Sequence, residues 1–211
     1  MKNESIKNLL FDLGDVIINI DVPIAFQAFA ELSGIDLDEI HALVKQHDLF
    51  RKFETGQLSE VEFRNTVRTI LKQEHWEDQH IDQAWNSLLL DIPVERIELL
   101  KALSTKYRLF LLSNTSSIHI TQVNKILHQA TGITSLDQLF EKVFVSYEMG
   151  MMKPDPNIYH GVLSQAEIRA DETLFLDDNG DNIAAAAQIG LQTIHVQKPT
   201  TILEYLEDYA V

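Results

Sequence analysis

Five short apolar runs recur along the chain, and helical patterns separate the later ones. The apolar runs cover residues 6–11, 109–112, 143–145, 174–176 and 193–196. Runs of this length are typical of strands that are buried on both faces of a sheet. The helical patterns cover residues 96–106, 118–129, 157–165 and 182–189. Strands that alternate with helices in this way predict an α/β fold with a doubly wound, Rossmann-like parallel sheet.

The segment between Ile20 and Asp91 breaks this alternation. It contains no convincing strand and has four amphipathic patterns, at residues 23–32, 37–52, 59–73 and 81–89. Ser59, with Glu62 three residues later, forms a capping-box pattern that predicts a helix start. We therefore expect a core of residues 1–19 and 92–211, and a small all-helical cap of residues 20–91 inserted after the first strand.

Charge and composition exclude several classes of function. The net charge of −15 and the lack of a basic stripe argue against nucleic-acid binding. The chain has no cysteine, which excludes disulfides and thiolate chemistry and fits a cytoplasmic protein. No apolar run reaches 18 residues, so we expect neither a signal peptide nor a membrane span. The sequence leaves open whether the protein is a monomer or a homodimer.

Polar groups follow four of the predicted strands. Because ligands of doubly wound sheets bind at the carboxyl ends of the strands, these groups are expected to meet at one edge. Taken alone, each of these groups is also explained as a turn residue, a helix cap or an exposed lysine. The adjacent carboxylates of Asp177 and Asp178 are harder to explain in this way, because they repel each other unless a cation or donor is present. The groups are Asp12 and Gly14, Ser113 and Asn114, Lys153, and Asp177 and Asp178.

This set of groups suits phosphoryl transfer. The Asp12 carboxylate can attack phosphorus and form an aspartyl-phosphate. The attack requires that negative charge be screened, and Mg²⁺ does so with oxygen ligands. Asp12, Asp178 and the backbone carbonyl of Gly14 are the expected ligands. Lys153 is expected to stabilise the transferring phosphoryl group.

The remaining polar groups have supporting roles in this hypothesis. Ser113 and the backbone amides near Asn114 are expected to hold phosphate oxygens at a helix start. Asp177 is expected to orient either Lys153 or a metal-bound water.

The ordered motifs FDLGD, LLSN, KPDP and FLDDN, the last followed by NIAAAAQIG, resemble the four motifs of the haloacid dehalogenase superfamily. The resemblance covers the whole chain, since the helical insertion matches the C1 cap of that superfamily. The cap phrase FETGQLSEVEF looks closest to a branch of sugar-phosphate phosphatases related to the N-terminal phosphatase domain of soluble epoxide hydrolases. The resemblance implies a magnesium-dependent phosphohydrolase that acts on a small phosphorylated metabolite, with sugar phosphates among the candidates.

The motif match assigns the same residues to the same roles: Asp12 as nucleophile, Gly14 and Asp178 at the metal, and Ser113 and Lys153 at the phosphate. Asn182 falls where many members carry a further aspartate.

One departure concerns the general acid. Most phosphatases of the superfamily carry an aspartate two positions after the nucleophile, which protonates the leaving group. This chain has Gly14 there. The neighbouring Asp15 is the local candidate, with an exposed turn residue as the alternative.

The cap is expected to set substrate specificity. His47, Phe50, Arg51 and Glu54 are candidates to face the site, with Arg51 as a substrate-binding residue, and ordinary helix packing is the alternative. Three rival functions share parts of this pattern: a metal-free 2-haloacid dehalogenase, a signalling receiver domain, and a catalytically silent binding protein on the same scaffold. Receiver domains carry the acidic pair after the first strand, whereas here the pair follows the fourth.

Overall fold

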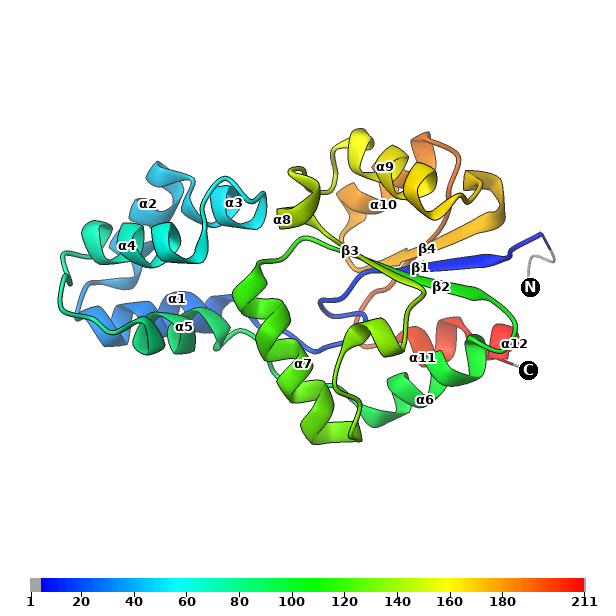
Figure 1. The fold of residues 1–211 in the computed structure, drawn as a ribbon, viewed down its shortest axis with the longest axis horizontal. Coiled ribbons are helices and arrows are strands. Elements are labelled where there is room, and N and C mark those ends of the chain that lie inside the picture. Colours follow the sequence, from blue (N-terminus) through cyan, green and yellow to red (C-terminus); the bar gives the residue numbers. More distant parts are fainter. Residues whose placement is uncertain (1–4, 211) are drawn as a thin grey trace.

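The computed structural model describes residues 5–210, and within them five parallel strands form one sheet in the order β3-β2-β1-β4-β5 (Figure 1). Each predicted apolar run overlaps one strand, so the predicted doubly wound sheet is confirmed. The strands are β1 (Asn8–Phe11), β2 (Arg108–Ser113), β3 (Lys142–Val145), β4 (Thr173–Asp177) and β5 (Gln192–His195). The central position of β1 places its carboxyl end between those of β2 and β4.

Both faces of the sheet are covered by helices because successive side chains of a strand point to opposite faces. Leu9 and Phe11 pack into one buried cluster and Leu10 into the other. The first face is covered by α6 (Val94–Leu103), α7 (Ser117–Thr131), α11 (Ile202–Tyr205) and α12 (Glu207–Ala210). The second face is covered by α9 (Pro156–Ala166) and α10 (Gly180–Gln188).

The inserted segment forms a separate group of helices at the left of Figure 1. They are α1 (Val22–Ser33), α2 (Leu37–His47), α3 (Leu49–Glu54), α4 (Glu60–Ile70) and α5 (Asp78–Asn86). These helices surround their own hydrophobic cluster, in which Phe53 stacks on Phe63 and both rings lie beside Trp85. The capping box predicted at Ser59 is present, with Glu62 as its partner.

The chain enters and leaves this helical group through two adjacent segments. Ile20 and Leu89 form an antiparallel bridge, and the Asn19 backbone amide donates to the Asp91 carbonyl. We propose that this short ribbon separates the cap, residues 20–91, from the core, residues 1–19 and 92–211. Residues 1–4 and 211 of the expected core lie outside the described residues.

The single helix expected over residues 37–52 is two helices, and the prediction was wrong at this point. Asp48 lies between α2 and α3 with φ of 49°, in the left-handed region, and its backbone amide donates to carbonyls of the last turn of α2. Aspartate tolerates this conformation better than most residues. The break turns the next helix so that Phe50 lies 4.2 Å from Trp85, measured between ring centroids.

Several short elements were not expected from the sequence. They are α8 (Ser146–Met149), α11, α12 and the 3₁₀ turns Leu136–Gln138 and Ala170–Glu172. Helices of three or four residues are too short to show a hydrophobic period. Within residues 5–210, none of the helices is both long and apolar enough to cross a membrane.

Candidate active site

Three carboxylates converge where the central strands end. Asp12 directly follows β1, Asp177 ends β4, and Asp178 is the next residue. One carboxylate oxygen from each residue lies within 4.8 Å of the other two. Asp12 and Asp177 are buried, whereas Asp178 is exposed. The parallel topology therefore brings together the residues that the sequence placed at this edge.

Lys153 lies in the middle of this acidic group. Its ammonium group lies 2.7 Å from Asp12 Oδ1, 2.6 Å from Asp177 Oδ2 and 3.0 Å from the Leu112 carbonyl oxygen. The side chain is only 1% exposed. It is a buried cation that bridges two carboxylates, and not the exposed lysine of the alternative interpretation.

Asn114 fixes the backbone of Lys153. Its Nδ2 donates to the Lys153 carbonyl at 2.9 Å, and its Oδ1 accepts from the Lys153 amide at 2.8 Å. Both polar groups of the Asn114 side chain are thus engaged, so its backbone amide is what remains for the predicted phosphate contact. Ser113 is a buried residue, and its hydroxyl makes no hydrogen bond to the part of the chain that the structure describes.

Asp177 is saturated with donors. Besides Lys153, it accepts from the Asn182 side chain at 3.0 and 3.1 Å and from the Asn179 backbone amide at 2.8 Å. The Asn182 backbone carbonyl in turn accepts from the hydroxyl of Tyr159. These bonds fix the Asp177 carboxylate against Lys153, which is the first of the two roles predicted for it.

The helix after β2 begins at Ser117, close to the expected start of the pattern over residues 118–129. Ser113 and Asn114 do not form its first turn: α7 begins at Ser117, with Ser116 as its N-cap. The intervening Thr115 amide donates to the hydroxyl of Ser146 at 2.9 Å. The expectation that Ser113 and Asn114 stand at the helix start is therefore wrong, whereas their contact with phosphate stays a prediction. The loop is extended because Ser146, at the start of α8, supplies an alternative acceptor.

The charges at this edge do not balance. When all are ionised, the three carboxylates and one ammonium group sum to −2. Burial and the nearby Asp177 raise the pKa of Asp12 to about 7, although Lys153 opposes the shift. Burial and Asp177 also raise the pKa of Asp178. Asp12 and Asp177 hold the pKa of Lys153 above its ordinary value despite its burial, so the lysine stays charged.

The residues present fit a divalent cation. A charge of +2 would neutralise the excess, and oxygen atoms are the ligands that Mg²⁺ prefers. Asp12 and Asp178 offer carboxylates. The Gly14 carbonyl accepts no hydrogen bond from the described residues, because the amides nearby donate to Leu13 and Ile18. Asp177 has no acceptor capacity left for direct coordination.

Gly14 and Asp15 lie in a tight turn after β1. A Cβ atom on Gly14 would lie 2.8 Å from Ile20 Cδ1, so the ribbon that leads to the cap occupies the space beside it. Asp15 is not the exposed turn residue of the alternative interpretation. It has φ of 54°, and its Oδ1 accepts from the Ile20 amide and lies 2.8 Å from the ammonium group of Lys198.

The cap residues expected near the site behave differently from one another. Arg51 is 67% exposed and lies 3.8 Å from Asp48, so the structure does not support its predicted binding role. His47 is exposed, and Phe50 packs between Phe26 and Trp85. Glu54 is half-buried, and burial raises the pKa of its carboxyl group to about 7.

The cap meets the core along α7, through contacts that the sequence did not predict. Trp85 Nε1 donates to the Ser116 hydroxyl at 3.0 Å, and the Trp85 carbonyl lies 3.0 Å from His119 Nε2. The two rings stack with centroids 4.3 Å apart. Burial lowers the pKa of His119 to about 4, so the ring is neutral at pH 7. Nothing local in the sequence pairs these residues, which are 34 positions apart.

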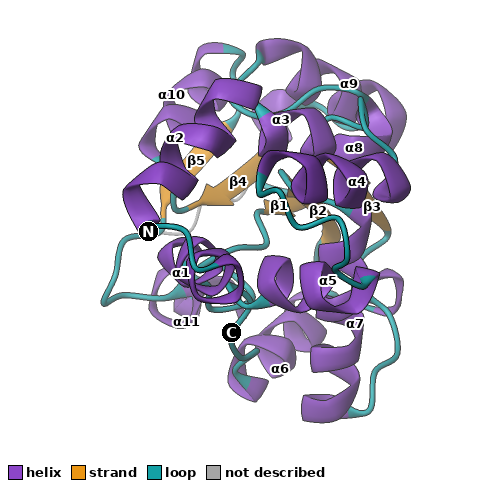
Figure 2. Cartoon of the chain, turned by 90° about the vertical axis from the view of Figure 1, so that its left-hand side faces the viewer, coloured by secondary structure: helices purple, strands orange, loops and turns teal. Residues whose placement is uncertain are grey.

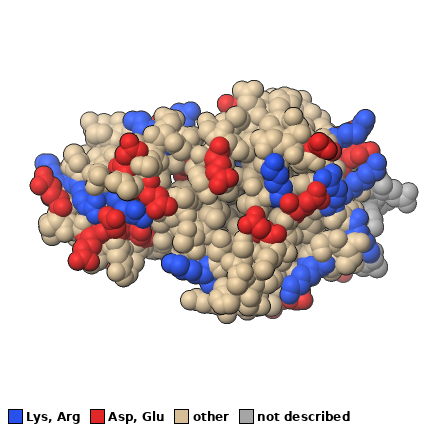
Figure 3. Space-filling model, viewed as in Figure 1, with Lys and Arg blue, Asp and Glu red and all other residues tan. Residues whose placement is uncertain are grey.

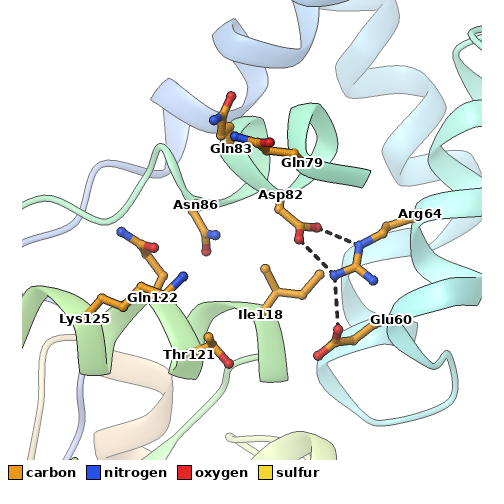
Figure 4. Close-up of a pocket in the computed structure, with 10 residues that line it drawn as sticks. All are labelled: Glu60, Arg64, Gln79, Asp82, Gln83, Asn86, Ile118, Thr121, Gln122 and Lys125. Atoms are coloured by element: carbon orange, nitrogen blue, oxygen red, sulfur yellow. Dashed lines mark hydrogen bonds and ion pairs between the residues drawn. The ribbon is translucent and has the colours of Figure 1, made fainter. Parts of the chain in front are cut away.

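A groove of about 460 Å³ lies on the same seam, between α4 and α5 of the cap and α7 of the core (Figure 4). Arg64 is held at its wall by Asp82 and Glu60, and the Asn86 Oδ1 atom is buried without a partner in the described residues. The groove contains none of the polar groups at the sheet edge, so it is separate from the candidate site.

Comparison with known proteins agrees with this geometry. The family model for haloacid dehalogenase-like hydrolase matches residues 6–190. D-ribitol-5-phosphate phosphatase of Bacteroides thetaiotaomicron is 30% identical over 188 residues, which is 89% of this chain and 90% of that protein.

Solved structures show the same fold over nearly the full length. A haloacid dehalogenase family enzyme from Bacteroides thetaiotaomicron, in complex with magnesium and inorganic phosphate, superposes with a TM-score of 0.86 at 35% identity and covers 95% of this chain and 98% of that one. A predicted hydrolase of the same type from Porphyromonas gingivalis gives a TM-score of 0.87 at 28% identity, covering 97% of both chains. The chain therefore belongs to the haloacid dehalogenase-like hydrolases.

Proposed function

We propose that this protein is a magnesium-dependent phosphohydrolase that acts on a small phosphomonoester, a sugar or polyol phosphate, through an aspartyl-phosphate on Asp12. The observation that supports this most directly is the buried Asp12–Lys153–Asp177 group with its excess of negative charge beside Asp178. A relative of similar length is a D-ribitol-5-phosphate phosphatase. A haloacid dehalogenase family enzyme that is 35% identical was solved with both magnesium and inorganic phosphate.

In this proposal the chain's own groups divide the work. Asp12 attacks phosphorus, so that a bond forms between its carboxylate oxygen and phosphorus while the bond to the ester oxygen breaks. Lys153 neutralises charge on the transferring group, and Asp177 with Asn182 keeps Lys153 in position. The Ser113 hydroxyl and the Asn114 backbone amide hold phosphate oxygens. Asp12, Asp178 and the Gly14 carbonyl would hold Mg²⁺, which when bound screens the charge of the phosphate.

The rival functions lose support. A metal-free dehalogenase has less need of the charge excess at this edge, and a silent binding protein has no need to keep a buried lysine between two carboxylates. The family assignment excludes a receiver domain. On the face shown in Figure 3, basic side chains alternate with acidic ones and form no stripe that suits nucleic acid. The expected cytoplasmic location and the choice between monomer and homodimer stay predictions.

The test is phosphate release from para-nitrophenyl phosphate and from a panel of sugar and polyol phosphates, each with magnesium and with EDTA. The wild type is compared with Asp12→Asn and with the surface control Asp38→Asn. Release that requires magnesium and Asp12, and that the control retains, would establish the activity. If folded protein that binds magnesium released no phosphate from any substrate, the proposal would be wrong and the silent scaffold would be favoured.

A further inference from the structure

Cleavage of an alkyl phosphate requires a proton donor that the sheet edge does not supply. An alkoxide is a poor leaving group unless it is protonated as it departs. Asp12 is the nucleophile in the proposed function, and Asp177 accepts four hydrogen bonds. Asp15 is held by Lys198, and the space beside Gly14 is filled by Ile20. The donor must therefore come from another part of the molecule.

The direction of the reaction points to the cap. Attacking and leaving oxygens of a phosphoryl transfer lie roughly in line, on opposite sides of phosphorus. Asp12 attacks from the carboxyl end of β1, so the leaving oxygen points away from the sheet. Figure 2, seen from the cap, shows α3 and α4 in front of the strand ends. A proton donor for the leaving oxygen is thus best placed on the cap side.

Glu54 ends the cap helix that lies against the core at this edge. Helix α3 packs on α8, and Gly56, two residues after Glu54, lies against the backbone of α8. A Cβ atom on Gly56 would lie 2.2 Å from the Tyr147 carbonyl oxygen. Tyr147 follows β3 by two residues, and the adjacent Ser146 holds the loop after Ser113. The end of α3 is therefore anchored beside the proposed phosphate-binding loop.

The Glu54 carboxyl group has no partner within the described residues, although protein encloses it on most sides. It makes neither a hydrogen bond nor an ion pair there, and the residue keeps some accessible surface. Enclosure raises its pKa to about 7, so that at neutral pH a large fraction carries the proton that a general acid must donate.

The charged groups on the elements around Glu54 are occupied elsewhere or exposed. On α3 itself, Arg51 lies beside Asp48 and Lys52 is exposed; on α2, His47 is exposed. On α4, Arg64 binds Glu60 and Asp82, and on α8, Tyr147 bonds with Glu148. None of these groups stabilises the Glu54 carboxylate, so its protonation is governed by enclosure.

We propose that Glu54 is the general acid for the leaving group, an inference that rests on the proposed phosphohydrolase function. As Asp12 forms its bond to phosphorus and the ester P–O bond breaks, the Glu54 carboxyl proton moves to the departing alkoxide oxygen and gives the free alcohol. In the second step water attacks phosphorus, Glu54 takes up one of its protons, and the bond between Asp12 and phosphorus breaks. Over the two steps the phosphate ester and one water become the free alcohol and inorganic phosphate, while Asp12 returns to its carboxylate form and Glu54 to its protonated form.

The test compares two leaving groups by kcat/KM, which reports the steps up to departure of the alcohol. A polyol phosphate such as D-ribitol-5-phosphate needs the proton, whereas para-nitrophenolate leaves as an anion. We expect Glu54→Gln to lower kcat/KM about 100-fold or more on the polyol phosphate and only a few-fold on para-nitrophenyl phosphate. The wild-type decline of kcat/KM above pH 7 on the polyol phosphate should disappear in the variant. Glu39→Gln, an exposed cap carboxylate, is the matched control and should match the wild type.

Other outcomes overturn the inference. Equal losses on both substrates, with an unchanged pH profile, would assign Glu54 a structural role, and full activity of Glu54→Gln would exclude any role. If the glutamine variant is poorly folded, Glu54→Asp is the substitute, because it keeps a carboxyl group. It should retain the wild-type ratio of kcat/KM on the polyol phosphate to kcat/KM on para-nitrophenyl phosphate. A loss of kcat/KM on the polyol phosphate alone, as expected for Glu54→Gln, would contradict the proposal. An inactive wild type would instead reject the proposed function itself.

Discussion

Replacing Asp12 by asparagine should stabilise the metal-free protein while it abolishes turnover. Asparagine has nearly the same shape, carries no charge, and keeps an oxygen that can accept from Lys153. The substitution removes one of the two buried carboxylates that share a single ammonium group. In the wild type, burial and the proximity of Asp177 make ionised Asp12 costly, which is why its pKa is raised.

The magnitude follows from linkage between proton binding and folding. The pKa of Asp12 is about 7 in the folded protein and 3.8 in the unfolded chain. Because the folded-state value is the higher one, the protonated carboxyl favours folding below pH 4, and this contribution is lost as the pH rises through 7. At about 1.4 kcal/mol per pH unit, the difference between these two pKa values corresponds to a free energy of about 4 kcal/mol. We therefore expect Asp12→Asn to gain about 2 kcal/mol at pH 5 and about 4 kcal/mol at pH 8.

The assay is urea unfolding in EDTA at pH 5 and pH 8, for the wild type and the variant. Magnesium should raise the midpoint of the wild type at pH 8 and have far less effect on the variant, which lacks one of the proposed ligand carboxylates. A variant that is no more stable than the wild type at pH 8, or whose gain is larger at pH 5, would refute the reasoning. In that case Lys153 would already compensate Asp12 in full.

Two further substitutions test the contacts around this group. Lys153→Met should destabilise the metal-free protein by about 3–5 kcal/mol, since it leaves two buried carboxylates without their cation. It should also lower kcat about 100-fold to 1000-fold. Unfolding in urea and steady-state kinetics measure the two effects, and an unchanged stability would contradict the burial argument. Gly56→Ala should destabilise by more than about 1 kcal/mol, because its φ of 70° disfavours alanine and the added carbon would overlap the Tyr147 carbonyl; a thermal midpoint equal to that of the wild type would show that the contact is dispensable.

The core was predictable because its chemistry is tied to the ends of apolar strands. A parallel sheet brings all carboxyl ends to one edge, so Asp12, Ser113, Asp177 and Asp178 could be placed together without knowing the packing of the helices. The position of Lys153 could be predicted only from the order of the motifs. The hydrogen bonds with Asn114 that hold its backbone join residues 39 positions apart, so no local pattern marks them.

The cap was predictable only in outline. The break at Asp48 is stabilised by the packing of Phe50 on Trp85 and not by a local breaker such as glycine or proline. Arg51, which follows this break, is exposed beside Asp48, and its role in substrate binding stays a prediction. The stacking of Trp85 on His119 is a tertiary contact between residues 34 positions apart, and no local sequence pattern marks it.

The division of groups between core and cap has a consequence for catalysis. The core supplies the nucleophile, the lysine and the proposed metal ligands, all fixed by strands and by hydrogen bonds between them. If the proton donor is Glu54, it reaches the substrate only while the end of α3 rests on α8. Cleavage of an ester whose leaving group must be protonated then depends on the contact between α3 and α8, whereas release of a stable anion does not. A loosened contact at Gly56 should therefore reduce cleavage of polyol phosphates more than cleavage of para-nitrophenyl phosphate, in the same direction as loss of the Glu54 carboxyl group.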